Sequence, residues 1–122
     1  QSVTTPGRRS YGGREVSLDV YLEVIKPTAI YSANITHNLN KMADAAGIYK
    51  ELWRPEEIGV TKARELIQPL ADGLSRLLAE PEKYRAFNPA NGWGDYEGLV
   101  EFVREYLAAC RENPDAAVKV SR

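Results

Sequence analysis

The sequence predicts an α+β fold. A small antiparallel sheet, made of N-terminal strands and a C-terminal strand, would pack against about three main helices. Three observations carry this prediction: an alternating apolar segment near the start, long stretches with apolar residues at helical spacing in the middle, and a short alternating tail. Strands at both ends with helices between them favour α+β over a doubly wound parallel sheet.

The first strand is predicted over residues 15–24, "EVSLDVYLEV". Apolar and polar residues alternate through this segment. A period of two is typical of a strand with one buried face. A turn follows at residues 26–28, and the apolar residues 29–33 predict a short second strand.

The next segment, "ITHNLNKMADAAGIYKELW", has apolar residues on one helical face. Thr36 is the expected N-cap, because its hydroxyl can accept a free amide hydrogen of the first turn. Gly47 is expected to end or bend this helix. A second short helical turn would follow and stop at Pro55.

Thr61 is the expected cap of a further helix, whose apolar stripe extends through Glu80. Pro81 suits a first helical position and predicts a short helical segment over residues 81–87.

Asp95 is the expected cap of the last helix, which would end at residues 113–114. In the tail that follows, Val118 and Val120 have strand spacing, so this tail could pair with the first strand.

A chain of 122 residues is expected to form a single domain over residues 1–122, with residues 1–13 as a flexible polar arm. Sixteen basic residues against seventeen acidic ones give a net charge of -1. Such a chain has no broad positive field for a nucleic acid polymer or an anionic membrane. Any anion site would therefore be a local cluster of arginines.

The chain has one cysteine, Cys110, so an intrachain disulfide is impossible and a reducing compartment such as the cytoplasm is expected. No apolar run approaches the roughly 18 residues that a bilayer span requires. Cys110 falls on the apolar face of the last helix, where a buried structural thiol is the expected role.

We expect no catalytic residues, no metal site and no cofactor. His37 is the single histidine, so a Ser-His-Asp or Cys-His arrangement would have to use it. One His and one Cys without a ligand-spacing pattern disfavour zinc. The glycines of "NGWGDYEG" do not form a phosphate-binding loop.

The stretch "YRAFNPANGWGDYEGL" between two expected helices offers the side chains of a binding site. Phe87 or Trp93 could stack on a flat ring, and the amides of Asn88 and Asn91 could read a base edge. Turn chemistry explains Asn-Pro and Asn-Gly equally well, and Trp93 could simply plug the core. The sequence leaves both interpretations open.

A second polar stretch, "YSANITHNL", places Asn34 and His37 at the strand-to-helix boundary. The helix N-termini expected at Thr36 and Asp95 would add amide hydrogens for an anion. Three further side chains could hold phosphates through their guanidinium forks: Arg54, Arg104 and Arg111. Arginines on helices are also commonly a solvated face.

The chain resembles small bacteriophage proteins and, more narrowly, the first family of Thoeris anti-defence proteins. The matching positions are Phe87 in "AFNP", Asn91 in "ANGW" and Arg54 in "LWRP", together with chain length and the order of strands before helices. The resemblance implies a compact α+β oligomer that sequesters cyclic ADP-ribose signals without degrading them. It also implies a pocket at a subunit interface and a phage protein acting in the host bacterial cytoplasm.

The leading functional hypothesis is therefore a non-enzymatic sponge for a nucleotide second messenger, either a cyclic ADP-ribose isomer or a cyclic oligonucleotide. Phe87 would stack on the base, Asn88 or Asn91 would hydrogen-bond it, and arginines would hold the phosphates. The open edges of a small sheet also predict a homo-oligomer, a dimer or larger. Two alternatives stay open: an interaction module that inhibits a host protein, and a small nucleotide-cleaving enzyme that uses His37.

Overall fold

A computed structural model describes residues 17–23 and 29–122. The arm expected at residues 1–13, the turn at 26–28 and both ends of the first predicted strand lie outside the described residues. The elements are, in chain order, β1 (Ser17–Glu23), β2 (Ala29–Thr36), the 3-10 helix η2 (His37–Leu39), α1 (Asn40–Ala45), α2 (Tyr49–Trp53), the 3-10 helix η3 (Pro55–Ile58), α3 (Arg64–Ala79), α4 (Pro81–Arg85), α5 (Tyr96–Glu112) and β3 (Ala117–Ser121).

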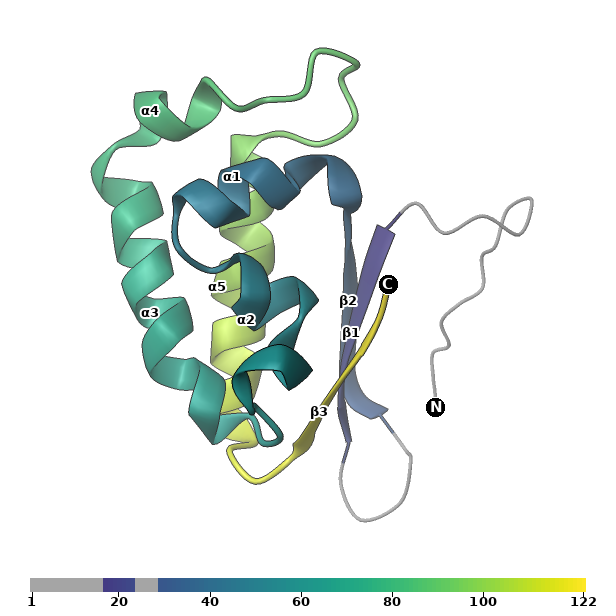
Figure 1. Cartoon of the computed structure of the whole chain (residues 1–122). Coiled ribbons are helices and arrows are strands. Elements are labelled where there is room, and N and C mark those ends of the chain that lie inside the picture. The colour runs from purple at the N-terminus through teal and green to yellow at the C-terminus, as the bar shows by residue number, and fades with distance from the viewer. Residues whose placement is uncertain (1–16, 24–28) are drawn as a thin grey trace, which may run out of the picture.

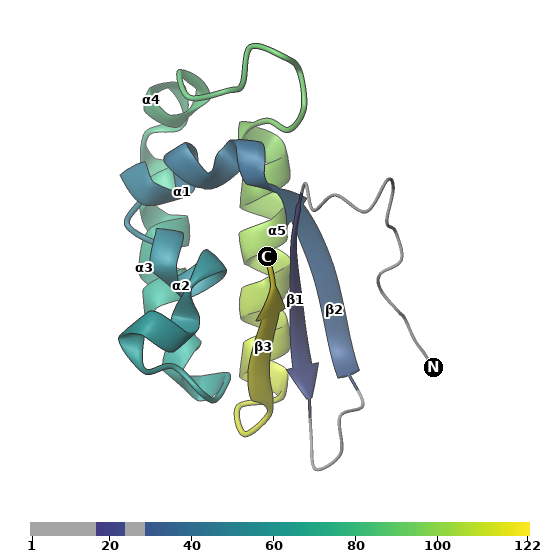
Figure 2. The ribbon, with the colours of Figure 1, turned by 45° about the vertical axis from the view of Figure 1, so that its right-hand side comes forward.

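The three described strands form one antiparallel sheet in the order β2-β1-β3. All the helices lie on the same side of this sheet, with α3 and α5 as the two long ones (Figure 1). Figure 2 shows the strands side by side, with α5 behind β3. The α+β prediction is confirmed, including the pairing of the C-terminal strand with the first one.

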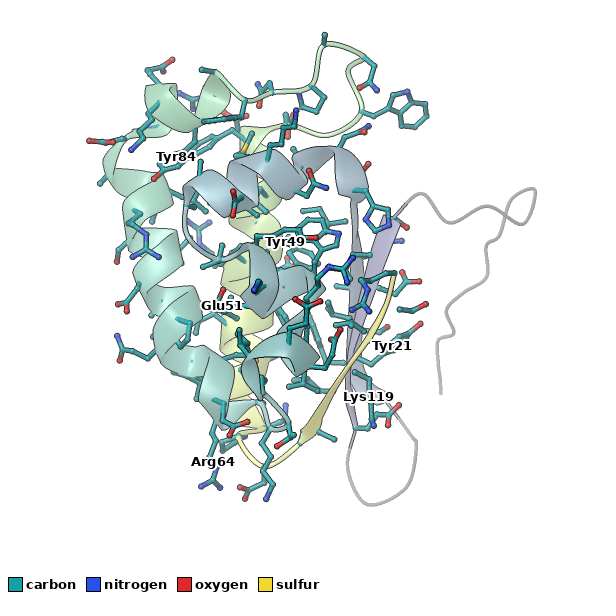
Figure 3. The ribbon with its side chains drawn as sticks, in the orientation of Figure 1. Tyr21, Tyr49, Glu51, Arg64, Tyr84 and Lys119 are labelled. Carbon is teal, nitrogen blue, oxygen red and sulfur yellow. The ribbon has the colours of Figure 1, made fainter. Side chains whose placement is uncertain are left out.

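The central strand β1 has one fully buried face, formed by Leu18, Val20 and Leu22. Val20 lies opposite Ala33 of β2 and Val120 of β3, so the apolar face continues across the whole sheet. The opposite face is polar. Figure 3 shows two of its residues, Tyr21 and Lys119, on the side turned away from the helices. The alternation of β1 therefore decides which side of the sheet the helices cover.

The second strand is longer than the sequence predicted. It runs to Thr36 instead of ending at residue 33, because residues 34–36 continue the antiparallel pairing with residues 17–19 of β1. Ile35 in this extension is buried on the helical side. Strand pairing thus overrides the polar composition of "SANIT", and β2 leads directly into the helical layer.

Two local predictions for the next segment are confirmed. The Thr36 hydroxyl accepts a hydrogen bond from the backbone nitrogen of Asn38 at 3.2 Å. Gly47, with a φ of 81°, separates α1 from α2. Glycine adopts this left-handed conformation without the steric penalty of a side chain, so the chain can reverse between the two helices.

The prediction that Thr61 caps the third helix is wrong. The helix α3 begins at Arg64, because the backbone of Thr61 and Ala63 is hydrogen-bonded to the segment that enters β3. The carboxylate of Glu65 accepts the backbone hydrogens of Thr61 and Lys62, at 2.7 and 3.0 Å. These two hydrogen bonds lower the pKa of Glu65, and the bond from the Lys62 backbone has the larger effect.

The last helix begins as predicted. Asp95 accepts a hydrogen bond from the backbone nitrogen of Gly98 at 2.8 Å, and α5 then runs from Tyr96 to Glu112. The Tyr96 hydroxyl donates to the carbonyl of Leu77 in α3 at 2.6 Å. This buried bond fixes the start of α5 against α3, and it therefore anchors the end of the loop that precedes α5.

The close packing of α3 on the start of α2 depends on Gly73. A Cβ added to Gly73 would lie 2.4 Å from the Cγ2 atom of Ile48. Gly73→Ala is therefore expected to lower the free energy of unfolding by about 1–3 kcal/mol, although alanine is the better helix former. Urea unfolding followed by circular dichroism measures this. In an Ile48→Ala background the same change should be neutral or stabilising, and an equal loss in both backgrounds would contradict the steric explanation.

Two phenols and the cysteine cluster between β2 and α5. The rings of Tyr31 and Tyr106 stack with centroids 5.9 Å apart, and neither hydroxyl has a hydrogen-bond partner among the described residues. Cys110 is buried, as predicted. Burial raises the pKa of Tyr31 and of Cys110 to about 12, and it raises the pKa of Tyr106 as well.

These three groups predict a loss of stability in alkali. In the unfolded chain Tyr31 and Cys110 would ionise near their ordinary values of 10.0 and 9.0. The folded chain keeps the protons up to about pH 12, so the free energy of unfolding should fall as pH rises from about 9 to 12. Urea titrations across this range measure the slope. Tyr106→Phe, which removes a hydroxyl without a described partner, should flatten the decline above about pH 10. An unchanged slope would contradict the argument.

Candidate functional site

The two polar stretches singled out in the sequence meet in the fold, although about fifty residues separate them. The side-chain amide of Asn38 donates to the backbone carbonyl of Trp93 at 3.5 Å. Gly94 packs so closely that an added Cβ would lie 2.7 Å from Cγ2 of Thr36 and 3.1 Å from Leu39. We call this meeting of residues 34–41 with residues 87–95 the junction. It brings the two proposed parts of a binding site together at one end of the molecule.

The α4–α5 loop is held by its own side chains. The Asn91 side-chain oxygen accepts the backbone hydrogen of Trp93 at 2.9 Å, and that of Asn88 accepts the backbone hydrogen of Tyr96 at 2.8 Å. Both asparagine oxygens are therefore used to shape the loop, as the turn interpretation predicts. A ligand at this loop would meet the amide nitrogens of Asn88 and Asn91 as donors.

This fixed loop presents two aromatic rings to solvent. Trp93 is 70% exposed and Phe87 is 41% exposed. The interpretation of Trp93 as a plug of the core is therefore wrong, since the buried positions under the loop are taken by residues of the helices and of η2. Large aromatic side chains held on a defined backbone are typical of recognition surfaces.

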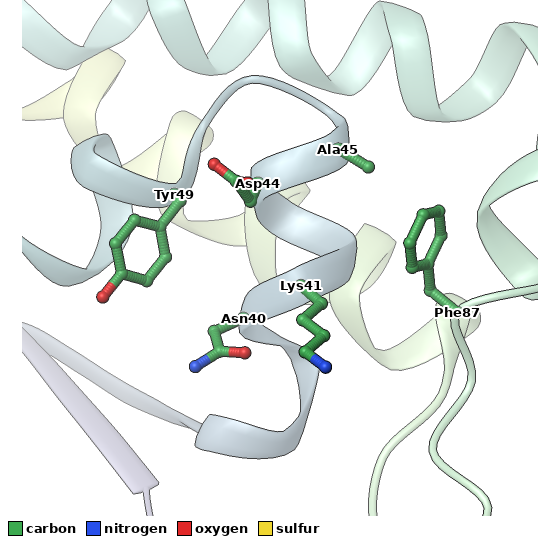
Figure 4. Close-up of a pocket in the computed structure, with 6 residues that line it drawn as sticks. All are labelled: Asn40, Lys41, Asp44, Ala45, Tyr49 and Phe87. Atoms are coloured by element: carbon green, nitrogen blue, oxygen red, sulfur yellow. The ribbon is translucent and has the colours of Figure 1, made fainter.

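A depression of about 480 Å³ lies beside the junction, over the exposed face of α1. Phe87 and Tyr49 line it together with four α1 residues: Asn40, Lys41, Asp44 and Ala45. Figure 4 shows Phe87 on one side of α1 and Tyr49 on the other, with Asn40 and Lys41 between them. The depression is shallow and open to solvent. It combines flat rings with one cation, one carboxylate and one amide.

The four α1 residues were missed in the sequence analysis. The apolar spacing of this helix drew attention to its buried face, whereas Asn40, Lys41 and Asp44 form the opposite face. Their position beside Phe87 depends on how the α4–α5 loop folds back over α1, which no local pattern records. The polar residues that closely follow His37 in sequence, Asn38, Asn40 and Lys41, were the available signal.

His37 belongs to an aromatic row instead of standing in the depression. Its Nδ1 atom accepts the indole hydrogen of Trp53 at 2.7 Å, so the ring proton is placed on Nε2. The Trp53 ring in turn stacks on the Tyr49 ring, with the two ring centroids 5.7 Å apart. The Tyr49 hydroxyl accepts from Nε of Arg54 at 3.2 Å. The row therefore links the junction to one wall of the depression.

The predicted phosphate-binding arginines are not gathered at one place. Arg54 contacts the Tyr49 hydroxyl and forms an ion pair with Glu57 at 3.2 Å. The hydrogen bond with Tyr49 is the main cause that raises the pKa of Arg54. Arg104 is exposed on α5 and pairs with Glu101 at 3.6 Å. Arg111 is exposed near the end of α5, and roughly 24 Å of helix rise separates it from Asp95. Neither α5 arginine lines the depression.

Asn34 lies on the outer, polar face of the sheet, where it is exposed opposite Asp19 of β1. Six of the predicted site residues fall within the two segments of the junction, namely Asn34, His37, Phe87, Asn88, Asn91 and Trp93, but only Phe87 lines the depression. Arg54 is connected to His37 through two side chains, Tyr49 and Trp53. Within residues 17–23 and 29–122, no group of three or more His, Cys, Asp or Glu residues is placed to hold a metal ion. No helix in the same ranges is both long and apolar enough to span a bilayer.

The hydrogen bond between Trp53 and His37 should stabilise the fold measurably. Trp53 is only 2% exposed, so losing its acceptor leaves a buried donor unpaired. His37→Ala is expected to lower the free energy of unfolding by about 1–3 kcal/mol. In a Trp53→Phe background the same change should cost clearly less, and a double-mutant cycle by urea unfolding isolates the pair. Equal costs in both backgrounds would show that the bond contributes nothing.

The chain was compared with protein-family models, curated proteins and solved structures, and none of them matched. The function is therefore inferred from the geometry of the junction and the depression.

Proposed function

We propose that the chain is a binding protein that sequesters a nucleotide second messenger at the depression beside the junction. The observation that carries this proposal is the position of Phe87. Its ring is 41% exposed, it comes from a loop held by Asn88 and Asn91, and it borders a depression that also contains a cation and an amide. Stacking, charge and hydrogen bonding are thus available within one surface.

Each part of a nucleotide finds a partner there. A base can stack on Phe87 or on Tyr49, since every base has a flat π-face. Lys41 supplies an ammonium group for a phosphate, and Asp44 can accept hydrogen bonds from ribose hydroxyls. Asn40 can both donate and accept. Lys41 and Asp44 have opposite charges, so the surface suits a ligand with few phosphates better than a polyphosphate.

The proposal extends to the setting implied by the resemblance to Thoeris anti-defence proteins. A phage protein of this kind would work in the host bacterial cytoplasm and bind a cyclic ADP-ribose isomer or a cyclic oligonucleotide without cleaving it. The depression is open in the single chain, and a second copy could cover it. The homo-oligomer expected from the sequence stays a prediction, which light scattering of the full chain would test.

Binding is measured by calorimetry with cyclic ADP-ribose isomers and cyclic dinucleotides. Phe87→Ala should weaken binding roughly tenfold to a hundredfold, because base stacking is worth about 1–3 kcal/mol. Leu78→Ala is the matched control, since Leu78 is exposed to a similar extent on α3 outside the depression and should leave the affinity unchanged. Recovery of the intact ligand after heat denaturation would agree with sequestration. No binding of any of these nucleotides by the folded chain would contradict the proposal.

The exposure of Trp93 favours a second candidate function, an interaction module that inhibits a host protein. Tryptophan is enriched among residues that dominate protein interfaces, and Trp93 does not line the depression. The same calorimetry separates the two functions. Trp93→Ala should leave nucleotide binding intact if the depression is the site, and it should abolish binding of a host protein if the loop tip is the interface.

A further inference from the structure

The two edges of the sheet differ in how they are protected. Beyond β3, the backbone of Thr61 accepts the amide hydrogen of Val118 at 2.9 Å, and Lys62 bridges to Ala117. The guanidinium of Arg122 then donates a hydrogen bond to the Trp53 carbonyl at 2.8 Å. Among the described residues, no comparable segment pairs with the outer edge of β2. One edge of the sheet is thus covered and the other has no described partner.

The register shows which groups of β2 point outward. Val118 directs its amide toward Thr61, away from β1, so the facing pair Leu22–Val118 is not hydrogen-bonded. Leu22 must then direct its backbone toward β2, where it faces Tyr31. Because backbone directions alternate along a strand, Ser32 and Asn34 turn their amide and carbonyl groups to the outer edge.

The composition of β2 leaves this edge open to pairing. The strand "AIYSANIT" is eight residues long and has no charged residue and no proline. Exposed edges in natural sheets are commonly blunted by lysines, prolines or very short strands. An uncharged edge of this length can accept an extended segment along its backbone, as in strand addition to other domains.

The side chains beside this edge are acidic. Glu105 directly precedes Tyr106, whose ring stacks on Tyr31 of β2 with centroids 5.9 Å apart, and its charge adds to the burial that raises the pKa of the Tyr31 phenol. A hydrogen bond with Glu101 raises the pKa of Glu105, so these two carboxylates lie next to each other on α5. Arg104 pairs with Glu101 at 3.6 Å and leaves this group one charge negative. A second copy paired through β2 would bring its own carboxylates to the same side, whereas a cationic segment would relieve the repulsion.

We propose that the outer edge of β2 is a docking site for an extended, basic peptide segment of a partner protein, which adds a strand to the sheet. Ser32 and Asn34 pair with the backbone of the segment. Its arginine or lysine side chains on the helical side meet Glu105 and Glu101. This site lies outside the depression, since none of the residues that line the depression belongs to β2.

The probe is an acetylated, amidated nonapeptide of alternating arginine and threonine, carrying a fluorophore for anisotropy measurements with the full chain. Alternation places all the arginines on one face of the strand. We expect the arginine–threonine probe to bind, and the matched glutamate–threonine peptide to bind at least about tenfold more weakly. The glutamine variants Glu101→Gln and Glu105→Gln should also weaken binding of the probe, and they should reduce its dependence on salt. Equal binding of the two peptides would overturn the proposal.

Ser32→Pro tests the backbone pairing. Proline removes an outward amide hydrogen without removing a bond to β1, so the strand should persist while peptide affinity falls at least about tenfold. Ser32→Thr keeps the amide and is the matched control. If Ser32→Pro does not fold, a probe N-methylated at alternate residues gives the same block from the peptide side. Strand addition would be overturned if the N-methylated probe bound the chain as tightly as the original probe. It would also be overturned if a folded Ser32→Pro chain bound the original probe with undiminished affinity. A full-chain dimer that Ser32→Pro converts to monomer would also overturn it, because the occupant would then be a second copy.

Discussion

The rest of the structure depends on the burial of one face of β1. Leu18, Val20 and Leu22 are completely buried, and β1 lies between the two other described strands of the sheet. Its register positions residues 31–36 of β2 and all of β3. A shift by one residue would turn this apolar face to solvent, so the pairing is strongly specified. Because β2 continues directly into η2 and α1, the same register also positions the polar face of α1.

The junction shows how a polar surface can be built without a buried polar core. Every residue that is buried among those described is apolar or aromatic or is Cys110. The site residues stay outside and are oriented by backbone contacts, such as the close approach of Gly94 to Thr36. The side-chain oxygens of the loop asparagines therefore accept backbone hydrogens of the loop and of the start of α5, while Phe87 and Trp93 stay exposed. Rigid aromatic side chains lose little conformational freedom on binding, which favours affinity on an open surface.

Particular residues show how far sequence reasoning reached. The cap at Asp95 and the break at Gly47 followed from local chemistry and are present. Thr61 failed as a cap because its backbone bonds to the segment entering β3, an interaction between residues far apart in sequence. The same limit applies to Trp93, whose exposure depends on whether the loop folds over α1 or under it. His37 was visible as the single histidine, but its partner Trp53 was not, because a turn and a helix separate them.

The sequence by itself determined the element types, the buried face of β1 and the α+β class, since alternation, helical spacing and caps are local properties of the chain. It also singled out both stretches that form the junction. Only the tertiary structure decided that these stretches touch, that Lys41 and Asp44 lie beside Phe87, and that Arg104 and Arg111 lie elsewhere. The physical reason is that contacts between distant segments arise from packing and strand register, which the whole core sets together.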